Sequence, residues 1–169
     1  ADGRARWWSS AGDVVRETAE PHADWISGLS LTPDEDRLAT SSQDGTLRVW
    51  NAASGELVET LPGHDGWVHD CDTASDGETI ASGGEDGTLR VWHEGRMVRV
   101  LQVGERVNAV RFTPAGERII SAGDGAAVSI WNAADGKRTN RLTGHEASIL
   151  ALTVSPDGRF VASGGIDDD

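Results

Sequence analysis

Tryptophan recurs at a nearly constant interval along this chain of 169 residues. Trp8, Trp50, Trp92 and Trp131 each close a short run that starts with Asp-Gly or, in the last case, Gly-Ala. The intervals between them are 42, 42 and 39 residues. A period of about 40–45 residues is typical of arrays in which each repeat is one small β-sheet. The interval therefore predicts a repeat protein. In such a protein, function is expected on the surfaces that the repeats form rather than in one catalytic pocket.

Within each period, four short runs rich in Val, Ile, Leu and Thr alternate with Gly, Asp, Asn and Pro, which is the pattern of strands and turns. The first complete unit predicts strands over residues 25–31, 37–42, 46–51 and 57–61. The next two units predict strands over residues 67–73, 79–83, 88–93 and 97–101, and over residues 107–113, 118–121, 127–132 and 138–142. Each unit is expected to be a four-stranded antiparallel meander.

A sheet of this size cannot bury both of its faces alone, so the units must stack on one another. Stacked radially, they form a β-propeller, which leaves only short edges. The expected fold class is all-β, with four blade equivalents of four-stranded antiparallel sheet in a single domain over residues 1–169. The predicted blades are 21–61, 62–101 and 102–142, and a split blade is shared between residues 1–20 and 143–169.

The two parts of the split blade are complementary. Residues 4–9 and 14–19 predict a third and a fourth strand, whereas 149–155 and 160–165 predict a first and a second. We expect two chains to close an eight-bladed ring as a twofold homodimer, in which the N-terminal strands of each chain pair with the C-terminal strands of its partner. A four-bladed monomer and other oligomers remain open alternatives, as does excision of the chain from a longer one.

A Gly-His pair precedes two of the units, as Gly63-His64 and Gly144-His145, and Pro21-His22 is a weaker version. With the tryptophan interval, these residues make the whole chain resemble the WD-repeat β-propeller family. The Trp-Asp pair that names the family is altered throughout. Its equivalents here are Trp50-Asn51, Trp92-His93 and Trp131-Asn132.

The resemblance implies a hydrogen-bonded chain of a buried His, a turn Asp, a Ser or Thr, and the Trp in each unit. The implied members are His22, Thr40, Asp44 and Trp50; His64, Ser82, Asp86 and Trp92; and, in the split blade, His145, Ser163, Asp167 and Trp8. The third unit departs from the pattern, because Gln102 and Val103 replace Gly-His and Asp124 lies one place early, with Gly125 at the turn position. We therefore expect the third unit to be the least rigid.

Composition narrows the classes of partner. The chain has 28 acidic and 15 basic side chains and a formal charge of −13, which disfavours nucleic acids and anionic membranes. The single Cys71 excludes an intrachain disulfide and a cysteine-based zinc site. No apolar run reaches the roughly 20 residues that span a bilayer, so a cytoplasmic location is expected.

Three groups of residues could be mistaken for reactive sites. The repeated His-Asp pairs are interpreted as structural, because catalysis needs one site and these are periodic. In the run His69-Asp70-Cys71-Asp72, alternation separates the imidazole from the carboxylates, so no metal site is predicted. The acidic run at residues 167–169 is interpreted as solvated rather than as a Ca²⁺ site. The prediction is a protein without catalytic residues, metal or cofactor, and not an enzyme.

Exposed aromatic residues give the better functional hypothesis. Trp25 and Trp67 follow His22 and His64 by three residues, at the rim of the expected central channel, and Arg106 and Ser148 occupy the same place in the other units. The resemblance implies that this rim binds protein or peptide partners, together with Gln43 and Glu85 before the turn Asp. Tryptophan and arginine are enriched in binding hot spots. The alternatives left open are that the tryptophans cap their own blades and that the chain is a structural half-propeller of a larger regulatory protein.

Overall fold

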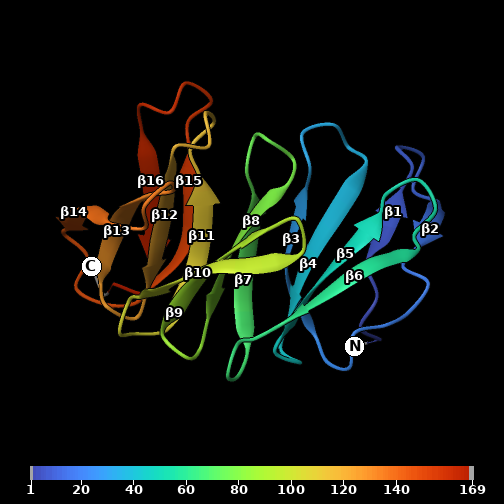
Figure 1. Cartoon of the computed structure of the whole chain (residues 1–169), viewed down its shortest axis with the longest axis horizontal. Coiled ribbons are helices and arrows are strands. Elements are labelled where there is room, and N and C mark those ends of the chain that lie inside the picture. Colours follow the sequence, from blue (N-terminus) through green and yellow to red (C-terminus); the bar gives the residue numbers. More distant parts are fainter. Residues whose placement is uncertain (1, 168–169) are drawn as a thin grey trace.

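The computed structural model describes residues 2–167, and within that range it contains β-strands and no helix (Figure 1). The strands form three four-stranded sheets and two two-stranded sheets, all antiparallel. We call the four-stranded sheets blades A, B and C and the two-stranded sheets the N half-blade and the C half-blade. The prediction of an all-β fold built from four-stranded antiparallel blades is confirmed.

The blades follow one another in the sequence. The N half-blade contains β1 (Arg6–Trp8) and β2 (Val14–Glu17), and blade A contains β3 (Ile26–Leu31), β4 (Arg37–Ser42), β5 (Thr46–Asn51) and β6 (Leu57–Pro62). Blade B contains β7 (Val68–Thr73), β8 (Thr79–Gly84), β9 (Thr88–His93) and β10 (Arg96–Gln102). Blade C contains β11 (Val107–Phe112), β12 (Arg118–Gly123), β13 (Ala127–Asn132) and β14 (Arg138–Thr143), and the C half-blade contains β15 (Ile149–Val154) and β16 (Val161–Gly165).

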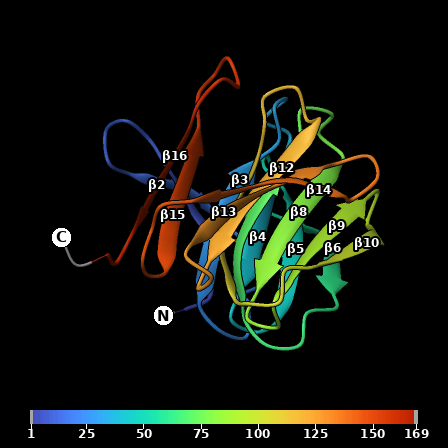
Figure 2. The ribbon, with the colours of Figure 1, turned by 90° about the vertical axis from the view of Figure 1, so that its left-hand side faces the viewer.

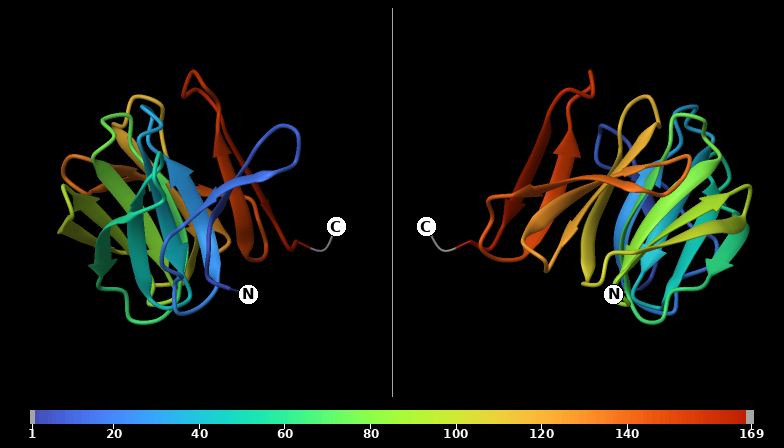
Figure 3. Two further views of the ribbon diagram at one scale, coloured as in Figure 1. Left: turned by 90° about the vertical axis from the view of Figure 1, so that its right-hand side faces the viewer. Right: turned by 60° about the vertical axis from the view of Figure 1, so that its left-hand side comes forward.

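The sheets stand side by side in an open arc, with the N half-blade at one end and the C half-blade at the other (Figures 1 and 2). The first strands of neighbouring sheets contact one another, β3 with β7, β7 with β11, and β11 with β15. The blades therefore radiate from one axis, as in a propeller. The two half-blades lie in separate sheets at opposite ends of the arc (Figure 1), and Figure 3 shows the same arrangement of sheets from two further sides.

Strand boundaries differ from the sequence prediction at the rim. The first strands of blades A and B were expected to begin at Trp25 and Trp67, but β3 begins at Ile26 and β7 at Val68. The tryptophan carbonyls instead accept hydrogen bonds from a neighbouring turn. Both tryptophans therefore belong to loops, where their side chains are less constrained by the sheet.

The hydrophobic core is divided into seams between sheets. The seam between blades A and B contains Leu47, Val49 and Leu61 from one blade and Val68 and Trp92 from the other. Equivalent seams join B to C, C to the C half-blade, and the N half-blade to A. Full burial of one large apolar side chain contributes roughly 1.5–3 kcal/mol. Each sheet obtains this stabilisation only by packing on its neighbour.

Two partly buried carboxylates reinforce the seam between blades B and C. Asp70 accepts hydrogen bonds from the backbone nitrogen of Val110 at 3.0 Å and from Arg111, and Asp72 accepts one from the backbone nitrogen of Phe112 at 2.7 Å. Burial raises the pKa of both carboxyls, and these bonds oppose the rise. Cys71, between them, faces the opposite seam. The irregular sequence of β7 thus forms a polar bridge between blades.

Candidate functional site

In blade A, four side chains form one hydrogen-bonded chain from the core to the rim. The indole Nε1 of Trp50 donates to Thr40 Oγ1 at 3.0 Å, and Thr40 Oγ1 lies 2.7 Å from Nε2 of His22. The Nδ1 atom of His22 lies 2.8 Å from Asp44 Oδ2. The imidazole side chain is fully buried. With Nδ1 protonated, every polar group in this chain has a partner, which is what a buried imidazole requires.

Blade B repeats the arrangement. Trp92 Nε1 donates to Ser82 Oγ at 3.0 Å, and Ser82 Oγ lies 2.8 Å from His64 Nε2. His64 Nδ1 lies 3.1 Å from the Asp86 carboxylate. A glycine is required beside this ring, because a Cβ atom on Gly84 would lie 2.3 Å from His64 Nδ1.

The electrostatics of these pairs favour a neutral imidazole beside a charged carboxylate. Burial lowers the pKa of His22 and His64, and the neighbouring Asp44 and Asp86 oppose that shift. Burial raises the pKa of Asp44, but hydrogen bonds from Thr46, His22 and the backbone outweigh it and bring the pKa to about 2. A neutral imidazole donates one hydrogen bond and accepts one, which matches the two partners of each of these histidines.

The same carboxylates hold the loops that carry the tryptophans. Asp44 accepts a hydrogen bond from the backbone nitrogen of Ala23 at 3.0 Å, and Asp86 accepts one from that of Asp65 at 3.0 Å. Each network therefore fastens the loop before one blade to the second turn of that blade. We call the surface formed by these loops and turns the loop rim.

A backbone hydrogen bond pairs the rim positions in every blade. The nitrogen of Gln43 donates to the carbonyl of Trp25 at 2.9 Å, and that of Glu85 donates to the carbonyl of Trp67 at 2.8 Å. The same bond joins Asp124 to Arg106 at 3.1 Å and Ile166 to Ser148 at 3.0 Å. The structure thus brings the six predicted rim residues into paired positions. It adds Asp124 and Ile166, which their constant offset from Arg106 and Ser148 could have revealed.

The rim side chains differ from blade to blade. Trp25 is 59% exposed and Trp67 is 44% exposed, so neither is a core residue. Trp67 meets His69 edge-to-face, with ring centroids 6.2 Å apart. Within the described residues, the buried Nε2 atom of His69 has no hydrogen-bond partner. His69 is a further rim residue, which the run His69-Asp70-Cys71-Asp72 does not indicate.

Arg106 is the centre of a polar network that crosses three sheets. Its guanidinium lies 3.3 Å from Glu85 of blade B and 3.7 Å from Asp124 of its own blade C. Asp124 also accepts hydrogen bonds from Ser148 at 2.9 Å and from Asn108 at 3.1 Å. Partly exposed ion pairs of this kind contribute at most about 1 kcal/mol to stability. A ligand can therefore replace them at little cost.

Blade C lacks the His-Asp pair and fills its place differently. Val103, at the position of the histidine, packs against the core shared by blades B and C. The Glu105 carboxylate lies over Gly125, where a Cβ atom would be only 1.6 Å from Glu105 Oε2. Trp131 Nε1 still donates to Ser121 Oγ at 2.9 Å. The tryptophan contact thus forms without the histidine and the aspartate.

The C half-blade contains three of the four predicted members of its network. His145 contacts Asp167 through Nδ1, and its Nε2 lies 2.8 Å from Ser163 Oγ. Trp8, the predicted fourth member, lies in the N half-blade at the other end of the arc and is 62% exposed. Asp168 and Asp169, the rest of the acidic run, lie outside the described residues.

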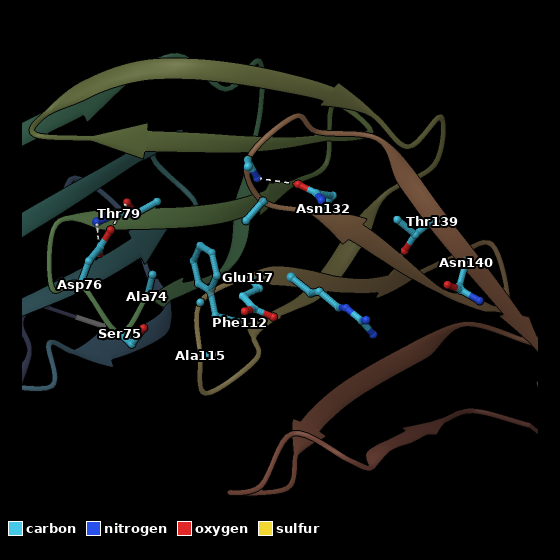
Figure 4. Close-up of a pocket in the computed structure, with 14 residues that line it drawn as sticks. Ala74, Ser75, Asp76, Thr79, Phe112, Ala115, Glu117, Asn132, Thr139 and Asn140 are labelled. Carbon is cyan, nitrogen blue, oxygen red and sulfur yellow. Dashed lines mark hydrogen bonds between the residues drawn. The ribbon is translucent and has the colours of Figure 1, made fainter.

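Two other features are weaker candidates for a site. Ligand atoms of Glu78, His93 and Glu94 lie within 4.8 Å of one another, but a hard cation needs about six oxygens. A hollow of about 660 Å³ lies at the turns opposite the loop rim, between blades B and C (Figure 4). Polar side chains that line it are used in those turns: Asp76 accepts from Thr79, and Asn132 accepts from the backbone of Ala134.

The repeat pattern has a counterpart among known families. The family model "WD domain, G-beta repeat" (WD40) matches residues 14–51, 55–93, 95–132 and 136–169. The chain belongs to the WD40 repeat family. It is 41% identical over 63 residues to the small ribosomal subunit protein RACK1 of Drosophila melanogaster and 40% identical over 63 residues to RACK1y of Oryza sativa subsp. japonica. These matches cover 36% of this WD40 chain and 20% and 19% of the two relatives, so the chain aligns with about a fifth of their length.

The family and these relatives support a role as a protein-interaction scaffold in general. WD40 repeat proteins of this kind are generally not catalytic. Among the described residues, no helix is both long and apolar enough to cross a bilayer.

Proposed function

We propose that this WD40 chain is a non-catalytic scaffold whose loop rim binds protein segments rich in basic residues. Two exposed tryptophans, Trp25 and Trp67, carry the proposal, because large exposed aromatic side chains with a polar handle are the residues that anchor protein partners. We place this activity in the cytoplasm and assign it no cofactor.

Charge supports a basic partner. The loops and turns of the rim expose six carboxylates beyond those held by the histidines, on Asp24, Asp65, Glu85, Glu105, Asp124 and Glu146. Among the described residues of these loops and turns, Arg106 is the one basic residue, and both Glu85 and Asp124 pair with it. Carboxylates beside tryptophan faces attract guanidinium and ammonium groups through ion pairing and cation–π contact.

The guanidinium groups of three strand residues also contact the rim. They belong to Arg48, Arg90 and Arg141, which bond to Pro21, Asp86 and Gly125.

The network around Arg106 gives the proposed binding a mechanism. An arginine of the partner can take the place of Arg106 between Glu85 and Asp124, while Arg106 turns outward. Trp67, whose carbonyl accepts a hydrogen bond from the backbone nitrogen of Glu85 and whose side chain is exposed, would supply the apolar contact. Because the partly exposed pairs are weak, the exchange loses little of the stability of the blades.

A titration with labelled peptides tests the proposal. An arginine-rich peptide is expected to bind, a glutamate-rich peptide of the same length is expected not to bind, and salt is expected to weaken the binding. Trp67→Ala is expected to raise Kd at least about tenfold. Val58→Ala, at an exposed position on β6 away from the rim, is the matched control. Equal binding of both peptides would reject the proposal, and a lower melting temperature of Trp67→Ala would assign the tryptophan to blade stability.

A second candidate function is assembly, in which the chain is a half-propeller that completes itself with another copy. The observation that favours it is the separation of the two half-blades. Among the described residues, β1 pairs only with β2, and β16 pairs only with β15. The edge at which the second and third strands of blade A pair is therefore free on both β16 and β1. Unpaired edges are ready templates for another strand. A homodimer that forms an eight-bladed ring would pair them.

A further inference from the structure

Blade C lacks a whole group of polar side chains that blade B has at the loop rim. Each position of blade C lies 39 residues after its equivalent in blade B, as Trp131 does after Trp92. Four residues of blade B are thereby replaced by smaller ones: His64 by Val103, Asp86 by Gly125, Thr88 by Ala127 and Arg90 by Ser129. In blade B the aspartate contacts the other three side chains. Blade C has therefore lost one connected hydrogen-bonded group.

A cavity lies where that group is missing. Its volume is about 270 Å³, and all four replacing residues line it. Gly123 lines it as well, and the equivalent Gly84 is the residue that lies against the ring of His64. The wall includes the exposed rim residues Glu105 and Arg106, so the cavity opens at the loop rim. Because one water molecule takes up about 30 Å³ of liquid, this volume admits a small polar group together with water.

Two buried hydroxyl groups on the wall have hydrogen-bonding capacity that the chain does not use. Ser121 is 1% exposed and Ser129 is 5% exposed. Ser121 Oγ accepts a hydrogen bond from Trp131, but its own proton has no acceptor among residues 2–167, because Val103 replaces the histidine. Ser129 Oγ makes no hydrogen bond within the same residues. Since buried polar groups nearly always have a partner, both hydroxyls favour an acceptor that comes from outside the chain.

The charged groups on the wall leave a surplus of positive charge. They are the guanidinium groups of Arg106, Arg138 and Arg141 and the carboxylate of Glu105. Arg106 forms ion pairs with two other carboxylates, whereas Arg138 and Arg141 form none among residues 2–167. Arg141 lies opposite Ser129 in the pairing of β14 with β13, so both side chains point to the same face of the sheet.

We propose that this cavity is an oxyanion site, which binds a carboxylate or phosphate group between Arg141 and the hydroxyls of Ser121 and Ser129. The two serines lie opposite one another on β12 and β13, so the three donors form one row across the blade. Guanidinium groups bind such oxyanions through paired, charge-assisted hydrogen bonds. A carboxylate offers two acceptor oxygens and a neutral imidazole only one acceptor nitrogen, so a row of three donors favours the oxyanion. The site goes beyond the binding of basic segments proposed above, in which none of these three residues takes part.

An NMR titration of the full chain with sodium acetate, and separately with inorganic phosphate, tests the proposal at constant ionic strength. The indole N–H of Trp131 donates to Ser121, so its resonance reports on the cavity. Trp50 and Trp92 make the same contact beside a histidine and are internal controls. We expect a saturable shift of the Trp131 resonance in the millimolar range and none for the other two. No saturable shift with either anion, or the same shift with sodium chloride, overturns the proposal.

Substitutions on the wall distinguish a binding site from a structural feature. Ser129→Ala should leave the melting temperature unchanged, because its hydroxyl has no partner among residues 2–167, but should raise the Kd of the anion about fivefold. Arg141→Gln should raise this Kd at least about tenfold. Glu105→Gln removes a like charge and should lower it several-fold. Arg96→Gln, at an exposed position on β10 away from the cavity, is the control. An unchanged Kd in both Ser129→Ala and Arg141→Gln would overturn the site.

The source of the oxyanion is tested with arginine-rich peptides that carry one glutamate, placed at each position in turn, and with glutamine counterparts of the same peptides. If a bound protein segment supplies the oxyanion, one of the glutamate peptides should compete with acetate at the Trp131 resonance, and its glutamine counterpart should not. If no peptide competes although acetate binds, the site takes a free small anion. The acetate titration contains no peptide, so its result and that of the rim-binding test remain independent.

Discussion

Blades B and C are neighbours with the same strand order, yet their turn aspartates have different partners. Asp86 of blade B binds the buried His64, whereas Asp124 of blade C binds Arg106, Ser148 and Asn108 at the surface. Both blades nevertheless keep the tryptophan-to-serine hydrogen bond. The comparison teaches that the sheet and its tryptophan do not need the His-Asp pair. The pair fixes the loop rim in blades A and B. In blade C, Gly125 stands at the position of the paired aspartate, and the Glu105 carboxylate lies over it.

Replacing the buried tryptophans should cause the largest losses of stability, and the loss should be similar in blades B and C. Trp92→Ala and Trp131→Ala are each expected to lower the free energy of unfolding by about 3–5 kcal/mol, because both leave a large cavity in a seam. Urea unfolding measures the change. A much smaller loss for Trp131→Ala would show that blade C does not share the packing of blade B.

Removing the turn aspartate should lower stability more in blade B than in blade C. Asp86→Ala is expected to cost about 1–3 kcal/mol, since it leaves His64 and the backbone nitrogen of Asp65 without their partner. Asp124→Ala is expected to cost less than about 0.5 kcal/mol, as is usual for an exposed position. Thermal unfolding of the two variants gives the comparison. Equal losses would contradict a structural role confined to Asp86.

Acid should destabilise the blades that contain a His-Asp pair. Burial lowers the pKa of His22 and His64 in the folded state, so their contribution is present above the unfolded value of 6.5 and is lost as the pH falls below it. Asp44, with a folded pKa of about 2 against 3.8, loses its contribution as the pH falls from about 3.8 toward 2. Hydrogen exchange resolved by peptide should show the upper step at the rim loops of blades A and B. The same step in blade C would exclude the histidines as its cause.

Rebuilding the complete pair in blade C should leave only a small net change in stability. Val103→His alone is expected to destabilise the blade by about 1–2 kcal/mol, because it adds an imidazole without a carboxylate partner. Adding Gly125→Asp and Glu105→Ala supplies the carboxylate and clears the space that Glu105 occupies, so the triple variant should recover most of that loss. Chemical denaturation of the single and triple variants measures the recovery. No recovery would mean that position 125 cannot present a carboxylate to the ring.

The sequence predicts those features that depend on periodicity. The tryptophan interval predicts the succession of blades. The spacing of His64, Ser82 and Asp86 predicts a hydrogen-bonded network, and these side chains do contact one another in the structure. Features that depend on the direction of one side chain were not predictable. Asp124 was interpreted as a displaced network member, and nothing in the spacing indicates that Glu105 takes the place of a missing carboxylate. The starts of β3 and β7 were placed one residue early because tryptophan favours strands, whereas these two tryptophans lie in the loops that their carbonyls help to fix.

The division of the core into seams has a consequence for how such chains evolve. Each seam takes one face from each of two sheets, so a duplicated unit brings one face for the sheet before it and one for the sheet after it. Gene duplication can therefore lengthen the array without redesigning an interior. Between such events each rim loop is free to diverge, as the differences among Trp25, Trp67 and Arg106 illustrate. Substitutions are therefore limited by packing in the seams between sheets, whereas the residues of the rim loops can change with little effect on the fold.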